Sequence, residues 1–153
     1  ELCMRRGLKE TKWPGRLEII NYLNKKILVD SAHNSHAAKA LSKERQTWLN
    51  ERKGVYWILG VQKQKDIFSI INFLVKQNDT LLLVPITNQD SWRLKDISGV
   101  KLINCAKIIE FEKLEFALEY LFKLGEWPSC HPVLTGSIFL VAEFIKFKNN
   151  QNS

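Results

Sequence analysis

A switch from strand to helix near the start of the chain carries the residues best suited to bind a ligand. Ile27–Val29 is a short apolar run typical of a buried strand, and helical periodicity begins at Ser35. Between them lie Asp30, a carboxylate at the strand end, and Asn34, a residue type favoured directly before a helix. A helix start attracts phosphate through its backbone N–H groups, and a strand-end carboxylate can accept hydrogen bonds from ribose hydroxyls. The spacing therefore predicts a nucleotide site at this turn.

Neither of the two common phosphate-binding loop sequences occurs in the chain. There is no G-x-G-x-x-G and no G-x-x-x-x-G-K followed by Ser or Thr. A plain strand-to-helix connection, in which Asn34 only caps the helix, is therefore the alternative interpretation of the turn.

Composition and charge argue against several other classes of function. The three cysteines lack C-x-x-C spacing, which is typical of reduced thiols rather than of a disulfide or zinc framework. His33 and His36 have no carboxylate or cysteine at a metal-ligand spacing, so we expect no metal site. The net charge of +7 comes from scattered lysines without an arginine-rich helix, which argues against nucleic acid as a partner. No apolar run could span a membrane and no signal peptide is evident, so we expect a cytoplasmic protein.

Strand and helix patterns alternate along the rest of the chain, which favours a mostly parallel sheet covered on both faces. A short polar turn joins the first two strands and predicts an antiparallel hairpin. The expected strands cover residues 16–22, 26–30, 55–61, 80–86, one or two pieces within 100–109, and 131–135, and the expected helices cover residues 35–50, 66–77, 114–122 and 137–148. We expect residues 1–13 to be the tail of a linker, 14–148 to be one α/β domain, and 149–153 to be a frayed end.

Four stretches, spread over nearly the whole chain, match one set of known motifs in the same order. They are W-P-G-R-L-E at 13–18, D-S-A-H-N-S-H-A at 30–37, the segment 59–66 that ends in Lys-Asp, and L-T-G-S-I-F-L-V at 134–141. Together they resemble the C-terminal domain of the folylpolyglutamate synthase and dihydrofolate synthase family, a branch of the Mur-ligase-like ATP-dependent amide ligases. Ser31 and Ser35 replace a glycine and a proline of the family pattern, and Gln64 replaces an aspartate.

The resemblance implies a three-layer α/β/α sandwich with a mostly parallel six-stranded sheet whose first strand is antiparallel. It also implies a ligase that uses ATP and Mg²⁺ to add L-glutamate to a folate or dihydropteroate carboxylate through an acyl phosphate. ATP would lie between this domain and a preceding P-loop domain that this sequence lacks, so we expect the magnesium ligands on the missing part and the isolated chain to be inactive. We expect a monomer.

The resemblance implies roles for particular residues. Asp30 and Asn34 would bind the nucleotide, and Arg16 and His33 would act at the phosphates or the incoming glutamate. Arg16 could instead be a surface residue of the linker.

Three further residues would face the substrate, namely Lys65, Asp66 and Ser137, although Asp66 and Ser137 could simply cap helices. A free-standing α/β module that binds nucleotide or nucleic acid without catalysis remains the alternative to the ligase.

Overall fold

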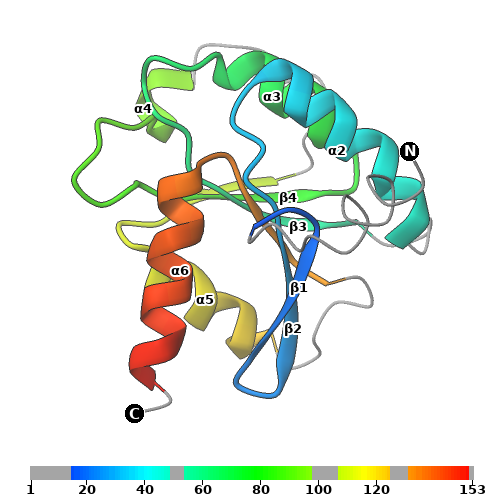
Figure 1. Cartoon of the computed structure of the whole chain (residues 1–153). Helices are drawn as coiled ribbons and strands as arrows, with labels where there is room; N and C mark the ends of the chain where they lie inside the picture. The colour runs from blue at the N-terminus through cyan, green and yellow to red at the C-terminus, as the bar shows by residue number, and fades with distance from the viewer. Residues whose placement is uncertain (1–14, 49–53, 98–106, 125–130, 152–153) are drawn as a thin grey trace, which may run out of the picture.

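In the computed structural model, which describes residues 15–48, 54–97, 107–124 and 131–151, the chain forms a six-stranded sheet with helices on both faces (Figure 1). The strands are β1 (Glu18–Tyr22), β2 (Lys25–Val29), β3 (Tyr56–Leu59), β4 (Thr80–Leu83), β5 (Lys107–Glu110) and β6 (Val133–Thr135). The helices are α2 (Ser35–Trp48), α3 (Ile67–Leu74), α4 (Leu94–Ile97), α5 (Leu114–Lys123) and α6 (Ile138–Gln151). None of these helices is both long and apolar enough to cross a membrane.

β1 and β2 form the predicted antiparallel hairpin. Their register pairs Glu18 with Val29, and Leu23 and Asn24 make the turn with φ values of 45° and 62°. Positive φ at both positions is what a two-residue turn between right-twisted strands requires. Because β1 runs against β2, the residues just before β1 lie at the same edge of the sheet as the carboxyl end of β2.

The remaining strands are all parallel, and the sheet order is β1-β2-β6-β3-β4-β5. Alternate residues of each strand enter different cores. In β3, Trp57 and Leu59 pack in the core that contains residues of α2 and α3, whereas Ile58 packs in the core that contains residues of α5 and α6. The two helix pairs therefore cover opposite faces (Figure 1). This arrangement confirms the expected α/β/α sandwich and its antiparallel first strand.

A crevice is expected where neighbouring strands send their helices to opposite faces. β2 and β6 are such neighbours, because α2 follows β2 on one face and α6 follows β6 on the other. The loops after these strands are joined by a hydrogen bond from Gly136 N–H to the Ala32 carbonyl, 3.0 Å long. Gly136 has φ of +105°, and a Cβ there would lie 2.5 Å from the Gly60 carbonyl oxygen, so only glycine fits this junction.

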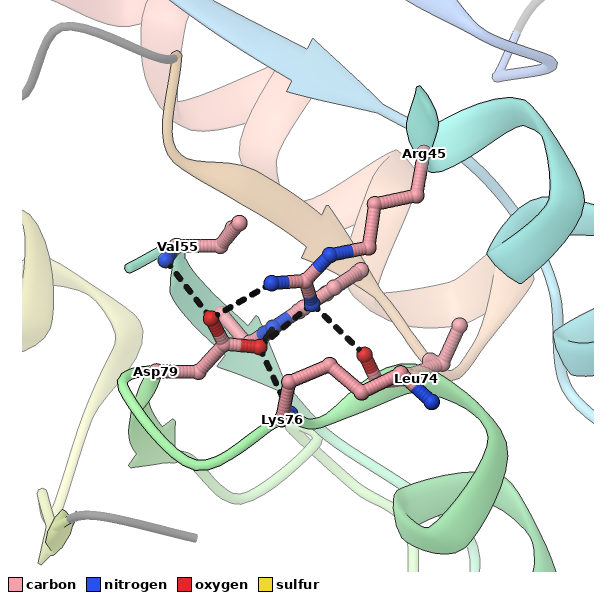
Figure 2. Close-up of polar contacts among 6 residues, drawn as sticks. Arg45, Val55, Leu74, Lys76 and Asp79 are labelled. Carbon is pink, nitrogen blue, oxygen red and sulfur yellow. Dashed lines mark hydrogen bonds and ion pairs between the residues drawn. The ribbon is translucent and has the colours of Figure 1, made fainter. Parts of the chain in front are cut away.

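An ion pair between Arg45 and Asp79 lies at the opposite edge of the sheet, where the parallel strands begin (Figure 2). Asp79, just before β4, is fully buried and accepts hydrogen bonds from both terminal nitrogens of Arg45 at 2.5 and 2.7 Å. Its oxygens also accept from the backbone N–H of Val55 and Lys76, both at 2.8 Å, and from the Trp57 indole at 2.9 Å. The cluster ties α2 to the starts of β3 and β4, and no pattern in the sequence indicated it.

Several element boundaries differ from those expected. The last helix continues to Gln151 instead of ending at residue 148, and the Gln151 side chain accepts a 3.1 Å hydrogen bond from the Tyr22 hydroxyl. The tail predicted to fray is thus helical to Gln151 and held to β1. The polar crossing after β4 contains the one-turn helix α4, which was not predicted. The expected linker 1–13 and the strand piece at 100–106 lie outside the described residues.

Candidate functional site

A pocket of about 460 Å³ lies at the carboxyl end of β2, between the turn that precedes β1 and the first three turns of α2. Its lining combines charged or polar groups with small apolar ones. The lining residues are Arg16, Leu17, Asp30, Ser31, Ala32, His33, Ala37, Ala40, Leu41 and Glu44. The structure therefore brings three of the predicted site residues, Asp30, Arg16 and His33, into one cavity.

Asp30 is half-buried and connects two loops through its carboxylate. One oxygen accepts a 2.8 Å hydrogen bond from Ala32 N–H, and the other accepts a 3.1 Å hydrogen bond from Leu17 N–H. A backbone bond of 2.6 Å from Ser31 N–H to the Gly15 carbonyl adds a second link between the same loops. Burial raises the pKa of Asp30, although the two N–H donors and the nearby Arg16 oppose that rise. Each carboxylate oxygen keeps a further acceptor position for a ligand hydroxyl.

Arg16 is exposed and lies between two residues in the left-handed region of backbone space. Gly15 has φ of 75° and Leu17 has φ of 46°. Left-handed backbone is unstrained for glycine but costs about 1 kcal/mol or more for leucine. The hydrogen bond to Asp30 helps to hold Leu17 in this conformation, and the turn places Arg16 on the pocket wall.

His33 and Asn34 have different positions relative to the pocket. His33 lines it, and its Nδ1 lies 2.9 Å from the Ser31 carbonyl. A neutral ring that donates this bond keeps Nε2 as an acceptor. Asn34 is the residue directly before α2, where its side-chain oxygen accepts a 2.9 Å bond from Ala37 N–H. Asn34 is not among the lining residues, so its geometry is that of a helix cap.

The three residues expected to face the substrate lie outside this pocket. Asp66 caps α3 by accepting bonds from Ser69 N–H at 3.1 Å and from the Ser69 hydroxyl at 2.5 Å, and these bonds lower its pKa. Ser137 is buried, and its oxygen accepts a 3.1 Å bond from Phe139 N–H at the start of α6. Lys65 follows β3, and its carbonyl accepts a 2.9 Å bond from the Trp92 indole. All three lie in segments after β3 or β6, at the same sheet edge as Asp30.

The apolar wall of the pocket was not predicted from the sequence. The wall consists of Ala37, Ala40 and Leu41, which follow the i, i+3, i+4 spacing of one helix face, and the charged Glu44 continues the same face one turn further. That spacing was the available signal, but in the sequence it is indistinguishable from a face that packs on the core. Ala37 and Ala40 are small side chains on this wall, and Asp30 lines the same pocket.

The described residues contain no group of three or more His, Cys, Asp or Glu side chains that could hold a metal ion. In the pocket, both oxygens of Asp30 already accept backbone N–H bonds, which is a poor donor set for Mg²⁺. Within the described residues, no cluster of side chains is therefore recognisable as a resident metal site.

Sequence comparisons identify relatives along nearly the whole chain. A family model described as dihydrofolate synthetase, C-terminal domain, matches residues 16–147. The probable dihydrofolate synthetase of Schizosaccharomyces pombe is 36% identical over an alignment that covers 94% of this chain and 36% of that protein. A dihydrofolate synthase/folylpolyglutamate synthase of Buchnera aphidicola is 26% identical, with 97% of this chain and 35% of that protein covered.

Solved structures share the fold. The E. coli FolC structure in complex with DHPP and ADP gives a TM-score of 0.77 at 23% identity and covers 100% of this chain and 35% of that one. The folylpolyglutamate synthase of Thermotoga maritima gives a TM-score of 0.75 at 22% identity, with 99% and 34% covered. The chain thus spans about a third of the length of its relatives.

Proposed function

The chain belongs to the family of dihydrofolate synthetase C-terminal domains, and from this we propose that it forms the nucleotide-binding side of an ATP-dependent ligase. The ligase would join L-glutamate to a folate or dihydropteroate carboxylate. The proposal includes an additional P-loop domain, because the chain spans about a third of its relatives and contains no P-loop sequence.

The observation that carries the proposal is the pocket around Asp30. It combines a carboxylate at a strand end, a guanidinium and a small-residue apolar wall, which together suit the ribose, phosphates and base of a nucleotide. Related structures add support, since they include E. coli FolC in complex with ADP and a Mycobacterium tuberculosis folylpolyglutamate synthase complexed with ADP and AMPPCP.

In this proposal, each lining group has a separate task. Asp30 accepts hydrogen bonds from ribose hydroxyls, and the wall of Ala37, Ala40 and Leu41 packs against the base. Arg16 lies toward the phosphates, where its positive charge stabilises the phosphoryl group during transfer. His33 presents Nε2 to the phosphates or to the glutamate amine.

The reaction itself consists of two transfers. The folate or dihydropteroate carboxylate attacks the γ-phosphorus of ATP, which releases ADP and forms an acyl phosphate. The amine of L-glutamate then attacks the acyl carbon, and inorganic phosphate leaves as the amide forms. Mg²⁺ would neutralise phosphate charge, and we propose that its ligands lie mainly on the other part of the ligase.

To test the proposal, a large side chain is introduced into the pocket and nucleotide binding is measured. Ala40→Trp should block the apolar wall without changing the hydrogen bonds of Asp30, and should weaken the binding of a fluorescent ATP analogue at least tenfold. Lys39→Trp is the matched control, since Lys39 is the adjacent exposed residue of α2 and does not line the pocket. Equal affinities for the two variants, with both folded by circular dichroism, would show that this pocket is not the nucleotide site.

A further inference from the structure

β1 forms one edge of the sheet, and within the described residues only β2 pairs with it (Figure 1). The hairpin register shows which backbone groups of β1 face outward. Leu28 lies opposite Ile19, but it donates its N–H to the Pro132 carbonyl beside β6, at 2.9 Å. Because backbone bonding alternates along an antiparallel pair, the N–H and C=O groups of Ile19 and Asn21 point away from β2. β1 therefore presents donors and acceptors along its outer edge.

This outer edge lacks the residues that commonly block strand pairing. Lysine and proline are typical blocking residues, and β1, with the sequence E-I-I-N-Y, contains neither. Instead, large apolar side chains are exposed along the hairpin. Ile19 is 55% exposed, and Leu17 and Leu23, which lie directly before and after β1, are 40% and 52% exposed. An open edge with exposed apolar side chains is suited to pair with another strand.

The outward groups of β1 are complementary to those of a second copy that runs antiparallel. When Ile20 of one copy lies opposite Ile20 of the other, Ile19 lies opposite Asn21 on both sides of the two-fold axis. Each Ile19 then exchanges two backbone hydrogen bonds with Asn21 of the second copy. The same register brings Leu17 of one copy near Leu23 of the other, so the second copy covers the exposed apolar side chains.

The charges beside β1 favour the same antiparallel arrangement. Glu18 and Lys148 line a groove of about 330 Å³ between β1 and α6. The end of α6 lies over the end of β1, where the Tyr22 hydroxyl bonds to Gln151 at 3.1 Å. The antiparallel register sets Glu18 of the second copy opposite Tyr22, on the side where Lys148 lies. Two pairs of opposite charge would form, whereas a parallel arrangement would place Glu18 beside Glu18.

We propose that β1 is a dimerisation edge, at which two copies of this chain pair antiparallel and join their sheets into one. The open edge, the self-complementary register and the two charge pairs select a second copy as the occupant. The inference rests on the fold alone and does not depend on the proposed function. It replaces the monomer that the family resemblance implied.

The experiment measures sedimentation and amide exchange of the 153-residue chain over a concentration series. The series extends to about 1 mM, because pairing of one strand with another makes a small interface of the weak class. We expect a monomer–dimer equilibrium in which the amides of Ile19 and Asn21, followed by NMR, become protected as concentration rises. The amide of Ile20 faces β2 and should be protected at every concentration. A chain that stays monomeric, or a dimer without added protection at Ile19 and Asn21, overturns the proposal.

A matched pair of isoleucine variants tests whether β1 forms the interface. Ile19→Ser should weaken the dimer about tenfold, because it removes an apolar side chain from the paired edge. Ile138→Ser is the control, since Ile138 is 61% exposed but lies on α6, which follows β6, two strands away from β1. Both variants should melt like the unaltered chain, because both side chains are exposed. Equal weakening by the two variants would place the interface elsewhere and overturn the proposal.

A charge exchange tests the antiparallel register. Lys148→Glu should weaken the dimer about tenfold, because it sets two carboxylates side by side at each end of the paired strands. Adding Glu18→Lys should restore the dimer, since it re-forms both pairs with the charges reversed. A double variant that dimerises as weakly as Lys148→Glu would show that these residues do not meet across the two-fold axis, and the proposed arrangement would be wrong.

Discussion

Arg16 and Asp30 line the same pocket, but only the Asp30 side chain also holds the surrounding turns in place. Asp30 accepts hydrogen bonds from the backbone N–H groups of Leu17 and Ala32, so its removal would loosen the turn that carries Arg16 as well as remove the proposed ribose contact. Arg16 is exposed on that turn, so its replacement should leave the fold intact. Arg16 is therefore the more informative position for kinetics.

In the proposed full-length ligase, Arg16→Ala should lower kcat about a hundredfold, the size expected when a preorganised charge that stabilises a transition state is removed. Arg16→Lys should recover part of the loss, since it restores the charge without the planar guanidinium. Steady-state rates with ATP varied, at saturating folate and glutamate, provide the measurement. An unchanged kcat for Arg16→Ala would favour the linker interpretation of this residue.

Asp30→Ala should mainly raise the KM for ATP, because a ribose contact is the same in the ground state and the transition state. The structure adds a second expectation, which is a smaller decrease in kcat as the Arg16 turn loosens. The same kinetic series measures both constants. A KM for ATP equal to that of the unaltered enzyme would show that Asp30 does not contact the nucleotide.

The Asp79 carboxylate is predicted to control acid stability. Its burial alone would raise its pKa, but the bonds from Arg45, Val55, Trp57 and Lys76 outweigh burial and lower it. A lowered pKa in the folded state stabilises the fold above the unfolded value of about 3.9, and that contribution is lost as pH falls through the folded value. Asp79→Asn should therefore cost about 3 kcal/mol at pH 7, with a cost that shrinks below about pH 4.

Urea unfolding at pH 7 and at several values below pH 4 measures this effect. Asp66→Asn is the control, because the pKa of Asp66 is also lowered but its carboxylate is exposed. A constant difference between Asp79→Asn and the unaltered chain at all pH values would contradict the electrostatic explanation.

At the scale of elements, the β6–α6 loop packs so closely against the end of β3 that Gly136 has no room for a side chain. Gly136→Ala would place a Cβ 2.5 Å from the Gly60 carbonyl oxygen at a φ of +105°. We expect a loss of about 1–3 kcal/mol in the free energy of unfolding. Gly60→Ala should cost less, because the nearest atoms to its Cβ would lie at 3.1 Å. Thermal or urea unfolding of the two variants compares them, and a larger loss for Gly60→Ala would contradict this ranking.

At the scale of the whole molecule, both faces of the sheet carry their own apolar core. We expect the isolated chain to fold cooperatively but not to hydrolyse ATP, because it contains no P-loop sequence. Circular dichroism melting and an ADP-release assay with folate and glutamate test the two parts. Folate-dependent ADP release by the chain alone would contradict the proposal that ATP hydrolysis needs an additional P-loop domain. Slower migration of duplex DNA in a gel at physiological salt would instead favour the alternative, a free-standing module that binds nucleic acid.

The sequence by itself determined the features that depend on neighbouring residues. Alternating apolar runs predicted the α/β class, and the short turn expected at residues 21–24 predicted the antiparallel hairpin. For Asn34 and Asp66, helix capping was the alternative to the predicted ligand-binding roles, and it was available from the sequence because a cap bonds to N–H groups only three residues away. Asp30 was likewise evident because a strand ends and a helix begins within a few residues of it.

Only the tertiary structure decided which distant segments meet. Insertion of β6 between β2 and β3 brings Gly136 against Ala32, and no local pattern encodes that strand order. The bonds from Arg45 to Asp79 and from Leu17 to Asp30 join residues 34 and 13 positions apart. The apolar wall of the pocket became distinct from core packing only once the turn before β1 lay opposite α2. The physical reason is that burial and long-range pairing depend on how the layers stack, whereas capping and periodicity depend on the local chain.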